Sequence, residues 1–135
     1  MIPEPSEKLI EVFIGCDEDV ILARKRIRAI TVEMGFSFLD QTRIVTAVSE
    51  LARNIVVHAG EGRMSAYKLK ARPGIRLVFE DQGPGIADLT LAMAEGYSSV
   101  GSLGLGLPGA RKLSDEFKVR TASGAGTTVT IVKWL

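Results

Sequence analysis

A chain of 135 residues has the size of a single domain, and its net charge of +1 gives no electrostatic attraction to nucleic acid or to anionic membranes. Its apolar fraction of 46% and charged fraction of 24% are those of an ordinary globular domain, and a lone cysteine, Cys16, excludes an internal disulfide. No apolar run reaches the ~18 residues that a membrane span needs, and the first residues lack the pattern of a signal peptide. We therefore expect a cytoplasmic protein that binds neither nucleic acid nor a membrane.

The first part of the chain predicts one strand and then a helix. Residues 1–8 are polar and contain proline, so we expect a loose end, and residues 9–16 have the β-branched and aromatic content of a strand. The helix is expected to have Asp17 at its N-cap and to stop at Gly35. Its apolar stripe repeats at a spacing of three to four residues, at Val20, Ala23, Ile27, Ile30 and Met34.

A second helix is expected to start near Ser37 or Asp40 and to run to about His58. Its apolar stripe consists of Ile44, Val48, Leu51 and Ile55. Glu50 and Asn54 are four residues apart and lie on a separate, polar face. Glu50 could accept a proton from an attacking hydroxyl or water, and Asn54 offers a neutral oxygen of the kind that Mg²⁺ takes beside phosphates and waters. A solvated helix face without such a role is the alternative.

The second part of the chain predicts strands around a long loop. The loop covers residues 82–103, which are rich in glycine and show no period, and a short helix follows at about residues 105–113. The strands are expected at residues 62–71, 75–81, 117–121 and 127–134. Because helices and strands segregate, we expect an α+β two-layer sandwich, with a mixed sheet covered by helices on one face and residues 9–135 forming one domain.

Asp81 ends a predicted strand and enters the segment Gln82-Gly83-Pro84-Gly85-Ile86. Glycines at this place let a planar ligand approach the backbone closely. A carboxylate only accepts hydrogen bonds, so Asp81 suits the exocyclic amine of adenine, whereas the carbonyl that guanine carries at that ring position would repel it. An ordinary turn rich in Asp and Gly is the alternative.

The stretch from Gly104 to Gly109 matches the pattern G-x-G-x-x-G, yet it does not predict a Rossmann fold. A loop rather than a strand precedes it, and no acidic residue lies about 20 residues later. The stretch instead offers free backbone N–H groups at the start of a helix, where anions bind. Thr127 follows Gly126 directly and is either a hydrogen-bonding partner for a base or water, or a plain strand residue.

In their order and spacing, these motifs resemble those of the GHKL ATPases. Glu50 and Asn54 resemble the N-box, and Thr127 matches a late threonine position of the family. Asp81-x-Gly83-x-Gly85 resembles the family's G1 box, and Gly104-x-Gly106 resembles its second glycine box. The resemblance covers about residues 9–135 and implies the Bergerat ATP-binding fold.

Within that family, the chain most resembles the serine/threonine switch kinases of the RsbT type from the bacterial stressosome. The shared stretches are residues 49–55, 80–86, 106–109 and 133–135. The resemblance implies a kinase that phosphorylates Ser or Thr on STAS-domain scaffold or antagonist proteins and, when free, activates a PP2C-type phosphatase or a similar output enzyme. Anti-sigma-factor kinases share the same ATP boxes, and His58 after the N-box is more like theirs, so an anti-sigma role is the alternative.

The resemblance also implies a role for each site residue. Glu50 would deprotonate the incoming hydroxyl, Asn54 would hold Mg²⁺ on the triphosphate of ATP, and Asp81 would bind adenine. Gly83 and Gly85 would give the base room. The other expected nucleotide contacts are Ile86, Gly101, Leu103, Gly104, Leu105, Gly106 and Thr127. Among these, residues 103–106 would cover the phosphates as a lid, and Thr127 would support Asp81.

Overall fold

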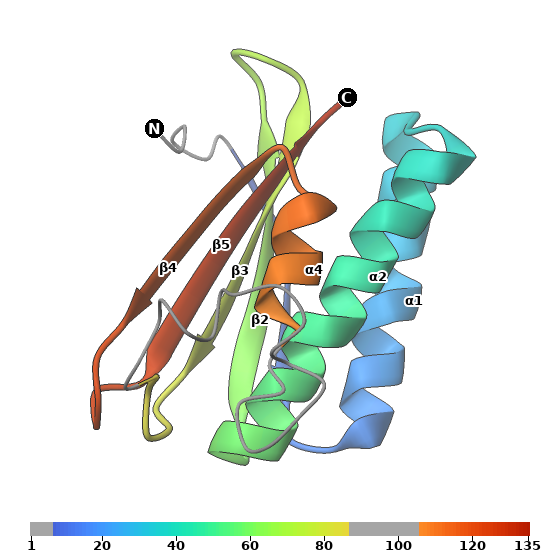
Figure 1. Cartoon of the computed structure of the whole chain (residues 1–135). Helices are drawn as coiled ribbons and strands as arrows, with labels where there is room; N and C mark the ends of the chain where they lie inside the picture. The colour runs from blue at the N-terminus through green and yellow to red at the C-terminus, as the bar shows by residue number, and fades with distance from the viewer. Residues whose placement is uncertain (1–6, 87–105) are drawn as a thin grey trace.

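The computed structural model describes residues 7–86 and 106–135 and shows helices on one face of a five-stranded sheet (Figure 1). The helices are α1 (Asp17–Met34), α2 (Phe38–Asn54) and α4 (Leu107–Lys112), and a π-helical turn, η1 (Ile55–Ala59), continues α2. The strands are β1 (Glu7–Ile14), β2 (Gly62–Leu69), β3 (Gly74–Asp81), β4 (Glu116–Thr121) and β5 (Thr127–Trp134). The α+β two-layer architecture expected from the sequence is confirmed.

Every neighbouring pair of the described strands is antiparallel, in the order β1-β2-β3-β5-β4. The expectation of a mixed sheet is therefore wrong in this detail. β3 and β4 do run in the same direction, but β5 lies between them and is antiparallel to both. Since parallel strands pair only when they are neighbours, this insertion of β5 removes the parallel pair.

The helix and strand boundaries fall within two residues of those expected from the sequence when η1 is counted as the end of the second helix. β1 begins at Glu7, so Glu7 and Lys8 belong to a strand and not to the expected loose end. They pair with Lys68 and Tyr67 of β2. The register between β1 and β2 shifts just after Lys8, which shows that the edge strand is irregular where it begins.

The start of α1 differs from the expected cap. Cys16 rather than Asp17 occupies the N-cap, with an extended backbone and no capping bond from its side chain. The carboxylate of Asp19 instead accepts a hydrogen bond from the backbone N–H of Gly15 at 2.9 Å. At the other end, Gly35 has a φ of 93° and ends the helix, as predicted.

The core lies between the sheet and the helices. The predicted stripe of α2 is completely buried, and that of α1 is buried at Val20, Ala23 and Ile27. These side chains pack against buried residues of the strands, among them Ile14, Met64, Leu77 and Ile131. Thr31 is a polar member of the α1 face, and its hydroxyl donates a hydrogen bond to the carbonyl of Arg28 at 3.0 Å. The buried hydroxyl is thereby satisfied.

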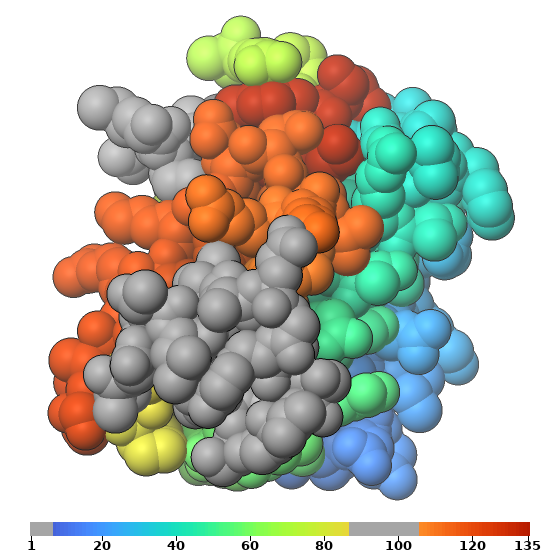
Figure 2. All heavy atoms as spheres, viewed as in Figure 1, coloured from blue at the N-terminus to red at the C-terminus, as the bar shows by residue number. Residues whose placement is uncertain are grey.

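α4 packs beside α2 on the helical side of the sheet (Figure 1 and Figure 2). Leu107 and Ala110 are its buried residues and join the core. α4 therefore extends the helical layer beside α2. Within residues 7–86 and 106–135, no helix is long and apolar enough to cross a membrane.

An ion-pair cluster joins α2 to the end of the sheet that is remote from Asp81. Lys133, near the end of β5, lies 3.1 Å from Asp115 and 3.7 Å from Asp40 in the first turn of α2. Its side chain is only 15% exposed. Since Thr127 begins β5 and Lys133 is near its end, the cluster anchors one end of the layers and leaves the other end to carry the candidate site.

Candidate functional site

A row of cross-strand partners brings three polar residues together at the end of the sheet. Asp81 of β3 is the partner of Thr127 in β5, and Thr127 is the partner of Thr121 in β4. Cross-strand partners lie on the same face of a sheet. The sequence separates Asp81 from Thr121 by a long stretch, and only the strand order places them side by side.

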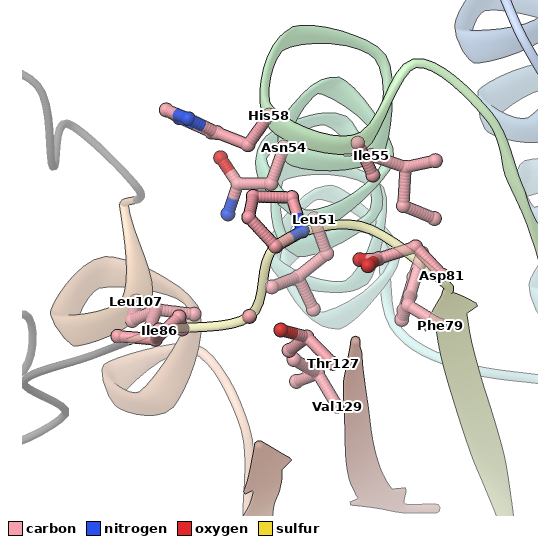
Figure 3. A pocket seen from close by; sticks show the side chains of 13 residues that line it. Leu51, Asn54, Ile55, His58, Phe79, Asp81, Ile86, Leu107, Thr127 and Val129 are labelled. Atoms are coloured by element: carbon pink, nitrogen blue, oxygen red, sulfur yellow. The ribbon is translucent and has the colours of Figure 1, made fainter. Parts of the chain in front are cut away.

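Asp81 and Thr127 line a cavity of about 220 Å³ between the sheet, α2 and α4. Figure 3 shows them on the strand side of this cavity, with Asn54 and His58 on the helix side. Most of the other lining residues are apolar: Leu51, Ile55, Ala59, Phe79, Pro84, Gly85, Ile86, Leu107 and Val129. Apolar walls with a few placed polar groups are typical of small-molecule sites, and the volume is below the roughly 300–1,000 Å³ of sites for drug-sized ligands. The cavity therefore suits one planar ring system.

Asp81 is held in place by its own loop. Its Oδ1 accepts a hydrogen bond from the backbone N–H of Gly83 at 2.9 Å. A carboxylate has about four lone-pair sites, so this bond leaves capacity for a ligand donor. The preceding carboxylate, Glu80, instead pairs with Arg63 of β2 at 2.6 Å, and this hydrogen bond raises the pKa of the Arg63 guanidinium. Since neighbouring residues of a strand point to opposite faces, Asp81 and not Glu80 serves the cavity.

The segment after Asp81 packs tightly on two neighbouring turns. Gly85 has a φ of 75°, and a side chain there would overlap the carbonyl oxygen of Ala122 in the β4–β5 turn. At Gly83, an added methyl carbon would lie 2.6 Å from the Cβ of Ala59 in η1. The close approach at these glycines is therefore to the protein's own turns, and only Gly85 also lines the cavity. This packing fixes the loop, and with it Asp81.

Asn54 and His58 come from the end of the second helix. Asn54 is the last residue of α2, and His58 lies in the π-helical turn that follows. Both line the cavity (Figure 3). π-helical turns occur frequently at functional sites. The sequence interpretation did not include His58 among the site residues, although the four-residue spacing of Glu50, Asn54 and His58 was a signal for it.

Glu50 lies outside the cavity, next to the start of α4. A side chain on Gly106 would overlap Oε2 of Glu50 and would lie 3.2 Å from its Cδ. Gly106 is the N-cap of α4 and has a φ of 63°. The structure therefore brings Glu50 and Gly106 together, but it separates Glu50 from Asp81 and Thr127, which line the cavity.

The remaining expected contacts divide into two groups. Ile86 is 9% exposed and lines the cavity. The expected contacts Gly101, Leu103, Gly104 and Leu105 lie outside the described residues. Thr127, which was expected to support Asp81, is joined to it through strand pairing, and its hydroxyl lies 2.9 Å from that of Thr121. Thr121 was not predicted as a site residue.

The described residues contain no group of three or more His, Cys, Asp or Glu side chains that could hold a metal ion. A cation that keeps waters and binds mainly to phosphate oxygens needs only one or two protein oxygens. The amide oxygen of Asn54 is the neutral oxygen ligand that the cavity wall offers for this purpose.

Comparisons with known proteins agree on one family. A family model described as histidine kinase-, DNA gyrase B-, and HSP90-like ATPase matches residues 39–135. The serine/threonine-protein kinase RsbT of Bacillus subtilis is 44% identical over 126 residues, which are 92% of this chain and 95% of RsbT. The anti-sigma F factor of Pasteuria penetrans is 29% identical over 131 residues, which are 91% of this chain and 87% of that factor.

A solved structure supports the same fold. The crystal structure of the RsbU and RsbW domains of Rv1364c from Mycobacterium tuberculosis superposes with a TM-score of 0.65 at 20% identity. The similarity covers 94% of this chain but only 32% of that chain. At this identity the likeness establishes the fold alone, and activity has to be argued from the site and from the sequence relatives.

Proposed function

We propose that this chain, which belongs to the histidine kinase-, DNA gyrase B-, and HSP90-like ATPase family, is an ATP-dependent protein serine/threonine kinase. The observation that carries the proposal is the 44% identity to the kinase RsbT over 92% of the chain. The family match runs from residue 39 to residue 135 and so includes every residue that lines the cavity. The resemblance to the GHKL ATPases, drawn from the motifs, is confirmed by these comparisons.

Adenine is the ring system that fits the cavity best. Its apolar faces suit the walls made by Phe79, Ile86 and Val129, and its exocyclic amine suits the carboxylate of Asp81. Guanine places a carbonyl at the same ring position, where it would face a carboxylate that can only accept. The site thus favours ATP over GTP through one hydrogen bond.

Mg²⁺ would be held by ATP and by the amide oxygen of Asn54. The metal supplies charge stabilisation for the transferring phosphoryl group when it is bound. Asn54 suits this role because it ends α2 at the rim of the cavity, four residues after Glu50. A neutral oxygen also adds no negative charge beside the phosphates.

Glu50 would act on the protein substrate. Its carboxylate lies outside the adenine cavity and beside the first turn of α4, so it does not contact the base. From there it would take the proton of the attacking Ser or Thr hydroxyl, while ATP supplies the phosphoryl group. Such a general base contributes about 10²–10⁴-fold to the rate.

The proposed protein substrates are STAS-domain scaffold or antagonist proteins of a bacterial partner-switching stress pathway in the cytoplasm. When it is free of them, the kinase would bind and activate a PP2C-type phosphatase or a similar output enzyme. The identity to RsbT supports this assignment over the more distant anti-sigma relatives.

The second candidate function is that of an anti-sigma factor whose ATP pocket mainly sets its conformation. It is favoured by the anti-sigma F factors that match about nine-tenths of the chain at 26–29% identity. Glu50 would be dispensable for binding a sigma factor. This difference separates the two functions experimentally.

The test is phosphate transfer to a purified STAS-domain protein, followed by mass spectrometry. We expect Glu50→Ala to lower the transfer rate by about 10²–10⁴-fold and to leave Mg·ATP affinity nearly unchanged. Glu33→Ala is the matched control, because it removes an exposed helical carboxylate on α1 away from the cavity, and it should transfer at the wild-type rate. Phosphate transfer by Glu50→Ala at the wild-type rate would refute the assignment of Glu50 as the general base. A wild-type protein that phosphorylates no STAS protein but captures a sigma factor would favour the second function.

A further inference from the structure

We propose that Thr121 is a positioning residue of the nucleotide site, which fixes the direction of the Thr127 hydroxyl and so makes Thr127 a hydrogen-bond acceptor toward the bound base. The inference rests on the proposed binding of an adenine nucleotide in the cavity. Thr127 lines that cavity, whereas Thr121 does not. Thr121 would therefore act on the ligand only through its neighbours.

The hydroxyl of Thr121 makes three close polar contacts. It accepts a hydrogen bond from the backbone N–H of Ile86 at 2.9 Å and donates one to the carbonyl of Gly126 at 3.0 Å. It also lies 2.9 Å from the hydroxyl of Thr127. A hydroxyl has one proton, and a carbonyl oxygen can only accept. We therefore assign the proton of Thr121 to the carbonyl of Gly126, and with this assignment Thr127 is the donor in the contact between the two hydroxyls.

This direction of donation decides what Thr127 offers to a ligand. Its proton points toward Thr121 and away from the cavity, so its remaining lone pairs can only accept. Asp81, its partner across β3 and β5, is also only an acceptor. The strand side of the cavity therefore selects a ligand edge with N–H donors, such as the 6-amino group of a purine, or a water that donates to both oxygens.

Thr121 also ties the loop after Asp81 to the β4–β5 turn. The hydrogen bond from the N–H of Ile86 joins the end of that loop to Thr121. The N–H of Gly124 in the turn also donates to the carbonyl of Pro84 in the loop. Ile86 lines the cavity and is 9% exposed. One hydroxyl on the neighbouring strand thus contacts both Ile86, an apolar wall of the site, and Thr127, one of its polar groups.

Inosine triphosphate is the probe for this inference, because it replaces the 6-amino group of ATP by a carbonyl. Thr121→Val removes the hydroxyl and keeps the shape, which frees Thr127 to turn its proton toward the cavity. We expect ATP affinity to fall about 10-fold, the order expected for one lost hydrogen bond, and ITP affinity to fall less or to rise. The ratio of ATP affinity to ITP affinity should therefore decrease.

Two further variants separate the hydroxyl from the side chain that carries it. Thr121→Ser keeps the hydroxyl and should stay within about threefold of the wild type in both affinities. Thr128→Val is the matched control, because it makes the same chemical change at the residue after Thr127 in β5. Thr128 points to the other face of the sheet. It should leave the ATP to ITP ratio unchanged.

Isothermal titration calorimetry with ATP and with ITP, at fixed Mg²⁺, measures both affinities for every variant. Equal loss of ATP and ITP affinity in Thr121→Val would overturn the inference, since a purely structural role weakens both alike. Binding of both nucleotides by Thr121→Val with wild-type affinities would also overturn it. If Thr121→Val does not fold, Thr127→Val tests the same ratio, which should narrow; an unchanged ratio there would overturn the inference too. A wild-type protein that binds neither nucleotide refutes the proposed function itself, whereas tight ATP binding with an unchanged Thr121→Val ratio refutes only the role of Thr121.

Discussion

Replacing Gly106 by alanine tests where the carboxylate of Glu50 lies. Gly106 precedes α4 with a φ of 63°, and a methyl group on it would overlap Glu50 Oε2 and lie 3.2 Å from Glu50 Cδ. The overlapping atom is the end of a flexible side chain. The carboxylate will therefore move away, while the backbone of α4 keeps its place.

The magnitude follows from two contributions. A left-handed φ costs an alanine about 1 kcal/mol, and forcing one side chain off its preferred rotamer costs of order 0.5–1.5 kcal/mol. Gly106→Ala should therefore lower the free energy of unfolding by about 1.5–2.5 kcal/mol. Gly124 is the matched control, because its φ is 77° and no atom lies within 4 Å of an added methyl group. Gly124→Ala should cost only the first contribution, about 1 kcal/mol.

Catalysis should separate the two glycine variants further than stability does. Misplacing a reacting group by about 1 Å can cost on the order of 10²-fold in rate, so phosphate transfer by Gly106→Ala should be at least about 10-fold slower than by Gly124→Ala. Urea unfolding measures the stabilities, and transfer to a STAS-domain protein at saturating Mg·ATP measures the rates. Equal transfer rates for the two variants would refute the assignment of Glu50 as a base acting beside Gly106.

Three further predictions concern adenine binding by Asp81, metal binding by Asn54 and the ion-pair cluster around Lys133. Asp81→Asn should weaken ATP binding by about 1–3 kcal/mol, because an amide replaces an oxygen that accepts from the adenine amine; equal wild-type affinities for ATP and GTP by calorimetry would contradict this role. Asn54→Ala should weaken nucleotide binding with Mg²⁺ but not with a chelator, and the same loss in both titrations would exclude a metal ligand. Lys133→Ala should lower the free energy of unfolding by about 0.5–1 kcal/mol, because it removes the shared cation of Asp40 and Asp115, while Asp40 keeps Arg43 and Asp115 keeps the N–H of Trp134. Lys70→Ala should change it by nearly nothing, since its side chain is 64% exposed and lies 3.9 Å from its partner, and equal urea midpoints for both lysine variants would argue against the anchor.

Local patterns account for the parts of the fold that the sequence predicted. The apolar stripe of α2 is buried at all four predicted positions because a helix between a sheet and solvent has one apolar face. Ser37 begins α2 as one of its two expected starts, since its hydroxyl accepts from the backbone N–H of Asp40 at 3.1 Å. These features depend on residues that are near one another in the chain.

Features that depend on strand order were out of reach of the sequence. Nothing local to β5 shows that it inserts between β3 and β4, and this insertion makes the sheet antiparallel. The same insertion sets Thr121 beside Thr127, which lines the cavity. The change from α-helix to π-helix before His58 could not be predicted either, for a different reason. The residues of α2 and η1 follow one continuous helical pattern in the sequence.

The helical spacing of α2 would let one small domain combine the proposed adenine recognition with the proposed proton transfer. Glu50 and Asn54 are four residues apart, so they lie on the same side of the helix about 6 Å apart along its axis. Asn54 reaches the cavity, while Glu50, one turn earlier, lies beside Gly106, the N-cap of α4. The helix would therefore fix Asn54, the proposed metal ligand, relative to Glu50, the proposed general base, without help from a loop. In the proposed site, adenine recognition would instead depend on Asp81 and Thr127, which the sheet holds and which the turns around Gly85 and Thr121 fix in place. A substitution in these turns should change which nucleotide binds, and a substitution on this face of α2 should change how fast a bound nucleotide reacts.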